Sequence, residues 1–410
     1  FLSLILIKQH LKLNMREVNL KLCVISDLHC HPQRETYEKN NTHLFTDKLR
    51  SPVRQHPVQS LHEIINENEL ETNIILCPGD FADKSNKQGL ISGWQYVQEI
   101  GRALKCNDII ATLGNHDVDS RNVSSKYSFE IAKKVKQDFP LPDKYIGSFW
   151  DRGYTFIEQD DVQILVLNTA HYHTHQTEDE DNPIVKGKID IGSIEEIERY
   201  LREHDDNNRI KIFLCHHHPV QHSRNELGEY DFVENGDQLV AVLGKFKFDL
   251  VVHGHKHDPW LRYHRTTLGY NIPILASGSF SASGQADQIG MFNYFHLIEI
   301  QKINGTVRAK MRTWEYLISK GWEISKGVNF KPYTGFGYTN NESLIANKIE
   351  TYLSTVGDTL VTWDDIIIQA PEIENLTPDQ IDTLQTLLLD KNIFTNPEIG
   401  SKPKHCYKHG

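Results

Sequence analysis

The chain has 410 residues and a formal net charge of −11, with 39% hydrophobic and 24% charged residues. These fractions are ordinary for a globular protein, and the length is sufficient for one large α/β domain with an additional module. The negative charge argues against tight, sequence-independent binding of nucleic acid, which needs a basic surface to displace counterions. An anionic small-molecule substrate stays open, because a bound cation can invert the local electric field.

The six cysteines are scattered along the chain, and none forms a CxxC pair. Such spacing is typical of a reducing compartment rather than of a disulfide framework. The apolar run Phe1–Ile7 is too short to span a bilayer, and no other stretch is long and apolar enough to do so. We therefore expect a cytoplasmic protein without membrane attachment. Because Met15 directly precedes the first convincing strand, we interpret residues 1–14 as an upstream or non-native extension.

Short apolar runs that alternate with amphipathic segments predict an α/β fold with a largely parallel sheet. The expected strands cover residues 20–26, 73–77, 108–113, 162–168, 210–215 and 249–252. A polar loop is expected over residues 32–60, and helices near residues 58–68 and 90–105 and from Ser193 onward, where Glu196 would complete a capping box. A hairpin of residues 291–300 and 307–314, joined at Asn304-Gly305, would close this domain.

The character of the chain changes at about residue 318. Thr377-Pro378-Asp379-Gln380 is typical of a helix start, with a capping box and a proline at the first helical position. We therefore expect a main domain of residues 15–317 and a small, mainly helical appendage of residues 318–410. The appendage carries no recognisable chemistry, and a protein partner that binds through it stays open.

Five of the expected strands end in side chains that commonly bind metal ions. Asp27 and His29 follow the first strand, and period-two geometry sends them to the same side. Because functional sites form at the carboxyl ends of parallel strands, we expect the strand ends to bring their polar residues together. The seven expected ligands are Asp27, His29, Asp80, Asn115, His217, His255 and His257.

The expected ligands offer imidazole, carboxylate and amide groups but no thiolate. This mixture favours borderline ions such as Mn, Fe or Zn over an all-oxygen Mg or Ca site. Seven ligands are too many for one ion, but they fit two ions that share a carboxylate and lie about 3.5–4 Å apart.

Taken in order, five motifs resemble those of the calcineurin-like metallophosphoesterase superfamily. The resemblance covers residues 18–315 and implies an α/β fold, namely a two-sheet αββα sandwich with a binuclear metal centre that hydrolyses phosphoric esters. The motifs are Asp27-Leu28-His29, Gly79-Asp80-Phe81-Ala82-Asp83, Gly114-Asn115-His116-Asp117, His217-His218-Pro219 and Gly254-His255-Lys256-His257.

The resemblance also implies roles for these residues. The residues implied for the first metal ion are Asp27, His29 and His257. Those implied for the second are Asn115, His217 and His255. Asp80 would bridge the two ions, and a hydroxide shared by them would attack phosphorus.

Two further implied roles concern the GNHD motif. His116 would face the phosphate together with Asn115 and stabilise the transition state or protonate the leaving oxygen. Asp117 would orient His116. Members of the superfamily usually place the histidine ligand two residues before proline, which selects His217, and His216 is the alternative.

The expected activity is that of a phosphodiesterase acting on a nucleotide-like substrate, because the GNHD and HHHP forms look most like those of class III cyclic-nucleotide phosphodiesterases. Alternatives on the same fold are a phosphomonoesterase, acting on proteins or small molecules, and a nuclease. A non-catalytic scaffold or a subunit of a larger assembly is an alternative of another class. The negative net charge argues against the nuclease, and the complete set of expected metal ligands argues against the non-catalytic scaffold.

Several polar residues near the motifs have an ordinary structural explanation. Asp83 and Asp119 are interpreted as caps or supporting residues rather than catalytic ones. His253 is expected to pack at a strand end. For His218, a substrate contact and a structural role both stay open. The chain also carries histidines beside the acidic run of residues 178–181, and of these His171 is kept as an expected substrate contact. The three are His171, His173 and His175.

Overall fold

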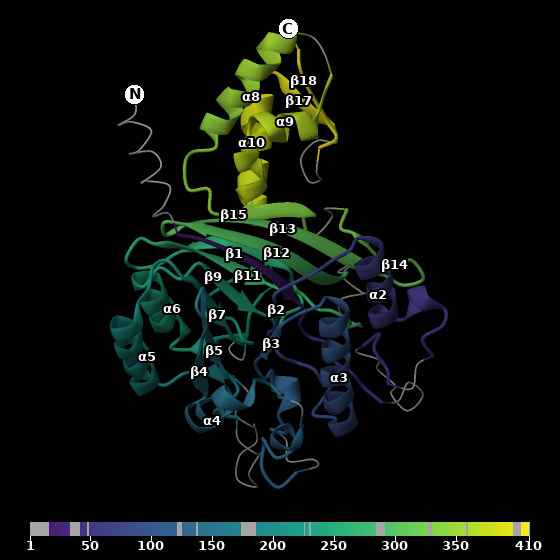
Figure 1. Cartoon of the computed structure of the whole chain (residues 1–410), viewed down its shortest axis with the longest axis vertical. Helices are drawn as coiled ribbons and strands as arrows, with labels where there is room; N and C mark the ends of the chain where they lie inside the picture. The colour runs from purple at the N-terminus through teal and green to yellow at the C-terminus, as the bar shows by residue number, and fades with distance from the viewer. Residues whose placement is uncertain are drawn as a thin grey trace, which may run out of the picture.

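Two mixed sheets packed face to face make up most of the chain (Figure 1). The structure is a computed structural model that describes residues 16–32, 42–46, 49–120, 125–136, 138–173, 186–224, 226–228, 231–283, 292–326, 330–357, 360–396 and 403–409. The expected extension of residues 1–14 and His175 lie outside the described residues. Within them, no helix combines the length and apolarity needed to cross a membrane.

Sheet 1 contains the first three strands of the chain, which are parallel, and a long antiparallel hairpin that follows β1 in the sheet. Its order is β14 (Gly321–Ile324), β13 (Thr306–Leu317), β12 (Asn293–Ile303), β1 (Glu17–Val24), β2 (Ile74–Cys77) and β3 (Asp108–Ala111), with β15 (Tyr333–Phe336) also paired with β13.

Sheet 2 has a parallel centre of β5, β7 and β9. Its order is β10 (Trp260–Arg265), β11 (Asn271–Ala276), β9 (Leu250–His253), β7 (Ile210–Leu214), β5 (Val162–Leu167) and β4 (Tyr154–Glu158). A separate pair consists of β6 (Gly187–Lys188) and β8 (Val233–Glu234).

Helices cover the outer faces of both sheets, which gives the αββα sandwich that the motifs predict (Figure 1). On sheet 1 lie α2 (Pro57–Glu67) and α3 (Lys87–Ala103), and on sheet 2 lie α5 (Ile191–His204) and α6 (Gly236–Lys245). The remaining helical segments of this part are α4 (Asp143–Arg152) and the 3-10 turns η1 (Val53–Gln55), η2 (Asn115–Asp117) and η3 (Ala132–Lys134).

The side chains of β7 alternate between two hydrophobic cores. Ile212 and Leu214 belong to the core between the two sheets, whereas Phe213 and Cys215 belong to the core beneath α5 and α6. This alternation fixes which residue after the strand points back between the sheets.

Most of the predicted elements are present, with shifted ends. The hairpin of β12 and β13 turns at Asn304 and Gly305, both with positive φ (49° and 78°), as the Asn-Gly pair predicts. Helix α5 begins earlier than predicted, because the carboxylate of Asp190 accepts the backbone N–H of Ser193 (2.8 Å) and caps the helix.

The predicted domain boundary at residue 317 falls inside sheet 1. Strands β14 and β15 come after it in the chain, and both pair with β13. The C-terminal module therefore starts after β15. It contains α8 (Ser343–Val356), β16 (Val361–Thr362), α9 (Trp363–Gln369), η5 (Pro371–Asn375), α10 (Pro378–Leu389), β17 (Ile393–Asn396) and β18 (His405–Lys408).

The C-terminal module has its own apolar core and a three-stranded sheet of order β16-β18-β17, so it is less purely helical than predicted. The capping box of Thr377 and Gln380 at the start of α10 is confirmed. The module stands on β13 and β15 of sheet 1 (Figure 1), where Nδ2 of Asn375 donates to the carbonyl oxygen of Ala309 (3.1 Å).

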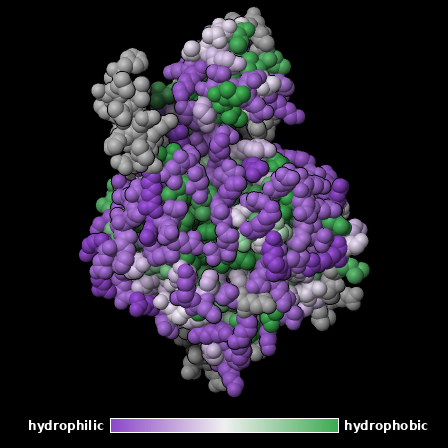
Figure 2. Space-filling view, in the orientation of Figure 1, coloured by the Kyte–Doolittle hydropathy of each residue, from purple (hydrophilic) through white to green (hydrophobic). Residues whose placement is uncertain are grey.

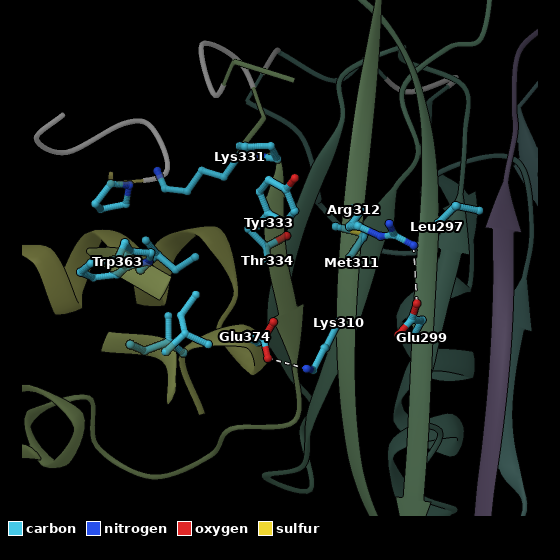
Figure 3. A pocket seen from close by; sticks show the side chains of 15 residues that line it. Leu297, Glu299, Lys310, Met311, Arg312, Lys331, Tyr333, Thr334, Trp363 and Glu374 are labelled. Atoms are coloured by element: carbon cyan, nitrogen blue, oxygen red, sulfur yellow. Dashed lines mark hydrogen bonds and ion pairs between the residues drawn. The ribbon is translucent and has the colours of Figure 1, made fainter. Parts of the chain in front are cut away.

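A cavity of about 340 Å³ lies where the module meets sheet 1 (Figure 3). Trp363 lines it on the module side, and Met311 and Leu297 line it on the sheet side. The charged residues of its wall form ion pairs, such as Lys310 with Glu374. The surface in the view of Figure 2 is mostly hydrophilic.

Candidate metal centre

The seven expected ligand residues lie on loops that follow strands β1, β2, β3, β7 and β9, at the edge where the two sheets meet. Five of the expected ligands have the left-handed backbone conformation that non-glycine residues rarely adopt. They are Asp27 (φ 53°), His29 (φ 47°), Asp80 (φ 56°), His255 (φ 82°) and His257 (φ 56°). Because such a conformation costs free energy, its concentration here indicates a functional site.

This backbone conformation changes the reason why Asp27 and His29 converge. The two residues follow the end of β1, at Val24, and both have positive φ, so strand alternation is not what places them on one side. Their backbone N–H groups donate instead to the carbonyl oxygens of Gly79 and Asp80 (both 3.0 Å), which ties the β1 loop to the β2 loop.

Three of the expected ligands form a first group. Nε2 of His257 lies 3.3 Å from Oδ1 of Asp27 and 3.0 Å from Nε2 of His29. The distance from Nε2 of His29 to Oδ1 of Asp27 is 3.8 Å. All three side chains come together as predicted.

The second group contains Asn115 and His255, but its third member is His216. Nε2 of His216 lies 3.1 Å from Oδ1 of Asn115 and 3.3 Å from Nδ1 of His255. Nδ1 of His255 lies 3.0 Å from the same Asn115 oxygen.

His217, the ligand expected here, is held by a different contact. Nδ1 of His217 lies 2.7 Å from Oγ1 of Thr169, and its Nε2 has no hydrogen-bond partner among the described residues. His216 continues the alternation of β7, in which even-numbered residues face the space between the sheets. His217 lies near the second group, however, since its ligand atom is within 4.8 Å of those of His216 and His255.

Asp80 lies between the two groups. Its Oδ2 is 3.7 Å from Nε2 of His29 and 3.4 Å from Nε2 of His216. Its other oxygen, Oδ1, accepts the backbone N–H of His116 (2.8 Å), which holds the carboxylate in this orientation.

The atoms of both groups have the spacing that a bound cation requires. Ligands about 2.1 Å from an ion lie roughly 3.0–3.4 Å from one another in octahedral or tetrahedral geometry, and most of the distances above are close to this range. Asp27, His29 and Asp80 are almost completely buried. Buried carboxylates and imidazoles gathered this closely fit a binuclear cation site.

Hydrogen bonds behind the imidazoles orient their free nitrogens. Nδ1 of His216 lies 3.0 Å from the carbonyl oxygen of Pro78 and donates to it, so Nε2 keeps a lone pair for a metal ion. Nε2 of His255 likewise lies 2.9 Å from Oδ1 of Asp231, which leaves Nδ1 free. Asp231 was not predicted, because nothing in the local sequence marks it.

Opposite charges in the site shift the pKa values of its members. Burial acts to raise the pKa of Asp27 and Asp80, but facing histidines outweigh burial and lower both values. Burial acts to lower the pKa of His29 and His216, but their carboxylate neighbours outweigh it and raise the values to about 10 and about 9. Asp27 and Asp80 therefore stay ionised, and their negative charge favours positively charged partners in the site.

His116 lies beside the first group, with its ring centroid 4.6 Å from that of His29, and 29% of its side chain is exposed. Its Nδ1 lies 3.3 Å from Oδ1 of Asp83 and 3.1 Å from the backbone nitrogen of Lys84. Both contacts hold Nδ1 on the protein side and leave Nε2 for a substrate.

Asp117 does not orient His116 as predicted. Its carboxylate accepts the backbone N–H groups of Asp80 (2.8 Å), Ala82 (3.0 Å) and Gly114 (3.0 Å), so it fixes the loop that carries Asp80. Asp83 lies in the position to orient His116, although its position in the sequence indicated only a supporting role.

At two positions of the motifs only glycine fits, because the backbone there lies very close to a carboxylate of the site. A Cβ atom on Gly114 would lie 2.0 Å from Oδ1 of Asp80, and one on Gly254 would lie 2.4 Å from Oδ2 of Asp27. Either side chain would displace a carboxylate of the site.

The remaining histidines lie around the site rather than in it. The ring of His171 packs near Phe129 and Tyr172 (centroids 6.4 and 5.2 Å), and its described contacts do not include a ligand residue. Burial lowers the pKa of His173 to about 3, and its nitrogens face Ser120 and the carbonyl oxygen of Lys186. His218 and His253 pack against each other (centroids 4.3 Å apart).

Comparisons with known proteins agree with this architecture. A family model described as calcineurin-like phosphoesterase matches residues 20–259. A second model, wHTH-Calcineurin_assc, which denotes a winged helix-turn-helix, matches residues 334–390. No curated protein of similar sequence was found.

Several solved structures are similar to the chain at low sequence identity. A dimetal phosphatase from Danio rerio has 12% identity and a TM-score of 0.44, and the match covers 73% of this chain and 99% of that one. A purple acid phosphatase from yellow lupin (Lupinus luteus) has 14% identity and a TM-score of 0.45, covering 76% and 53%. The NAD nucleotidase of Haemophilus influenzae has 14% identity and a TM-score of 0.38, covering 76% and 61%.

The family model spans more than half of the chain and includes the DxH, GDxxD, GNHD, HHHP and GHKH motifs, whose residues meet between the two sheets. The chain therefore belongs to the calcineurin-like phosphoesterase family and is a metal-dependent phosphoric ester hydrolase.

Proposed function

We propose that this protein is a phosphodiesterase that hydrolyses a nucleotide-like phosphodiester at a site for two cations. The position of Asp80 carries the proposal, because one carboxylate oxygen faces both groups of ligands, at 3.7 Å from His29 and 3.4 Å from His216. A shared carboxylate is the usual link between two ions that act together on a phosphoester.

The proposed ligands follow from the distances. For the first cation they are Asp27, His29 and His257, together with Asp80. For the second they are Asn115, His216, His217 and His255, together with Asp80. The donor chemistry favours Mn, Fe or Zn, and when bound such cations would screen the phosphate charge and acidify a water molecule.

His116 is the proposed general acid. Its side chain is 29% exposed, whereas its Nδ1 accepts the backbone N–H of Lys84 (3.1 Å), so the ring carries its proton on Nε2. A proton on Nε2 can pass to the alkoxide oxygen that leaves phosphorus. Because the carboxylate of Asp83 stays next to Nδ1, the ring keeps its orientation while the proton moves.

A diester is preferred over a monoester because the short GNHD and HHHP forms look most like those of class III cyclic-nucleotide phosphodiesterases. Direct evidence requires a comparison of substrates. Metal-stripped protein reloaded with Mn should hydrolyse bis-p-nitrophenyl phosphate, a diester, with a higher kcat/KM than p-nitrophenyl phosphate, a monoester. The opposite preference would favour the phosphomonoesterase.

The role of His116 has its own test. His116→Ala should keep both metal ions and lose most of the diesterase activity, whereas His204→Ala, at the exposed end of α5, should keep both properties. Unchanged activity of His116→Ala would remove His116 from the mechanism. Asp80→Ala should lose bound metal, and full retention would contradict the shared carboxylate.

Two broader features are part of the proposal. All six cysteines are free thiols, which supports the expected reducing, cytoplasmic location.

The C-terminal module packs on sheet 1 through β13 and β15, away from the loops that carry the proposed ligands. We therefore assign it to interaction with a protein partner rather than to the chemistry.

A further inference from the structure

The loop with the GHKH motif contributes a proposed ligand to each of the two cation sites. His257 belongs to the first group of ligands and His255 to the second. Both residues have positive φ (56° and 82°), and such strained conformations persist only where the surrounding structure holds them. The segment that follows Pro219 supplies this support through two contacts, one beside each histidine.

The first contact fixes the chain directly after His257. Asp258 is 1% exposed, and its Oδ2 accepts the backbone N–H of Arg224 (2.9 Å) and the hydroxyl of Ser223 (3.3 Å). Its Oδ1 accepts from Nε of Arg224 (3.0 Å) and also from Nη2. The same Nη2 donates to the carbonyl oxygen of Pro259 (3.2 Å). One arginine therefore holds the two residues that come after the ligand.

The second contact fixes the ring of His255. Its Nε2 lies 2.9 Å from Oδ1 of Asp231, and its Nδ1 lies 3.0 Å from Oδ1 of Asn115 in the second group. The carboxylate of Asp231 is itself held, because Oδ2 accepts the backbone N–H of Gly228 (2.7 Å) and lies 3.0 Å from Nζ of Lys256. Asp231 therefore sets which nitrogen of the ring carries the proton and which one faces a cation.

The two contacts have opposite arrangements of charge. In the first, a cation of the supporting segment meets an anion that follows the GHKH motif, Arg224 with Asp258. In the second, an anion of this segment meets a cation of the motif, Asp231 with Lys256. A shift of one segment along the other would separate both pairs and leave the buried Asp258 without its cation, which is costly. The contacts together therefore favour the one position of the loop in which both histidines face their ligand groups.

We propose that Arg224 and Asp231 are positioning residues of the metal centre and that each serves one of the two cations. Arg224 acts on the first site, because it holds His257 through Asp258. Asp231 acts on the second site, because it holds His255 directly. Neither residue is itself a ligand. The inference rests on the ligands given under the proposed function and not on the proposed substrate, and it requires that the two residues affect different ions.

Titration of metal-stripped protein with Co²⁺ tests the inference, because the visible absorption of this ion reports its coordination without any turnover of substrate. The wild type should bind two ions. Arg224→Met should raise the Kd of one ion about tenfold or more, since the buried Asp258 loses its cation and the loop that follows it in the contact is no longer held. Asp231→Ala should raise the Kd of the other ion about tenfold or more, since the ring of His255 loses its orienting carboxylate.

Arg50→Met is the matched control. The guanidinium of Arg50 also binds a carboxylate, that of Glu99 on α3 (Nη2 to Oε2, 2.9 Å), and 43% of its side chain is exposed, against 39% for Arg224. Because α3 lies on the outer face of sheet 1, this variant should keep the Kd values of the wild type for both ions. A general loosening of the fold is thereby distinguished from a loss of positioning.

The variant His216→Ala shows which cation each residue serves. It should keep one ion at the first site, whose ligands are intact. Addition of Arg224→Met should raise the Kd of this ion about tenfold or more. Addition of Asp231→Ala should instead leave this Kd unchanged, because the residue acts on the other site.

The outcomes separate the inference from the proposed metal centre. An unchanged Kd in Arg224→Met or in Asp231→Ala would overturn the inference while two ions still bind to the wild type. Equal weakening of both ions by each variant would overturn it too. Fewer than two bound ions in the wild type would contradict the metal centre itself, and the inference would fall with it.

If Arg224→Met does not fold, Arg224→Lys decides. Lysine keeps a cation beside Asp258 but cannot donate from two nitrogens at once, so the Kd of the first ion should rise several-fold. An unchanged Kd of this ion in Arg224→Lys would overturn the inference.

Discussion

Nε2 of His216 lies 3.1 Å from Oδ1 of Asn115, so a histidine that follows a strand of sheet 2 meets an amide that follows a strand of sheet 1. The contact crosses the sandwich at the edge where both parallel strand groups end. It also identifies which histidine of the HHHP run faces the space between the sheets.

The first prediction concerns this histidine. His216→Ala should reduce bound metal from two ions to about one per chain, because the second group loses a ligand. His217→Ala should also reduce bound metal, because its Nδ1 faces Thr169 and its buried Nε2 has no partner among the described residues. His204→Ala, at the exposed end of α5, is the control and should keep both ions. Metal analysis by mass spectrometry after removal of free ions measures both. Retention of both ions by His216→Ala or by His217→Ala would remove that histidine from the ligand set.

Part of this site could be predicted from sequence because its strands are buried on both faces. Strand β2 is apolar throughout and β7 is apolar except for Lys211, so both stand out as runs that end in polar motifs. The same period-two pattern, continued from Ile212 and Leu214, selects His216. The rule of a ligand two residues before proline selects His217 instead, and the structure places both histidines beside the second group.

Other features could not be predicted because they depend on tertiary contacts. Edge strand β10 contains Arg262, His264 and Arg265 and therefore has no apolar run that would mark it as a strand. Asp231 orients His255 from a loop far from any motif. The roles of Asp83 and Asp117 depend on how the loops after β2 and β3 fold against each other, which spacing alone does not specify.

The second prediction concerns Asp83. Asp83→Asn should lower kcat by about 10- to 100-fold, because the imidazole of His116 loses a carboxylate 3.3 Å from its Nδ1. Both metal ions should stay bound. Asp119→Asn, a buried aspartate whose carboxylate accepts from Ser125 (2.7 Å), is the control and should keep kcat. Full activity of Asp83→Asn would show that His116 needs no such partner.

The third prediction concerns Asp117, whose carboxylate accepts three backbone N–H groups. Asp117→Asn turns one acceptor into a donor that faces an N–H group, and so should lower the free energy of unfolding by about 1–3 kcal/mol. Metal affinity should fall with it, because the loop of Asp80 loosens. Urea unfolding and metal titration check both effects. A loss of kcat alone would instead support the orienting role predicted from sequence.

The fourth prediction concerns the C-terminal module, where the winged helix-turn-helix model matches residues 334–390. In helix-turn-helix proteins the second helix of the motif enters the major groove. Helix α10 of this module presents the exposed residues Asp379, Thr383 and Thr386, and the exposed Asp390 follows its end. Acidic residues repel phosphates, so the protein should not bind duplex DNA at low salt in fluorescence anisotropy. Tight binding that weakens with salt would contradict this prediction.

The last prediction concerns His296 on β12, which is fully buried and far from the metal centre in the sequence. Its Nε2 donates to the carbonyl oxygen of Ser277 (2.9 Å) and its Nδ1 accepts from Thr313 (2.8 Å), so the ring is neutral. Burial lowers its pKa to about 4 from an ordinary value of 6.5.

Between pH 6.5 and 4 the unfolded chain therefore binds a proton at this position that the folded chain excludes, and the free energy of unfolding should fall as the pH falls. His296→Gln removes the group that binds this proton. The slope of the unfolding free energy against pH should therefore become smaller, by an amount that corresponds to at most one bound proton. Urea unfolding of metal-stripped protein across this range measures the slope, which separates the linkage from any general loss of stability. An unchanged slope would mean that His296 is protonated in the folded protein.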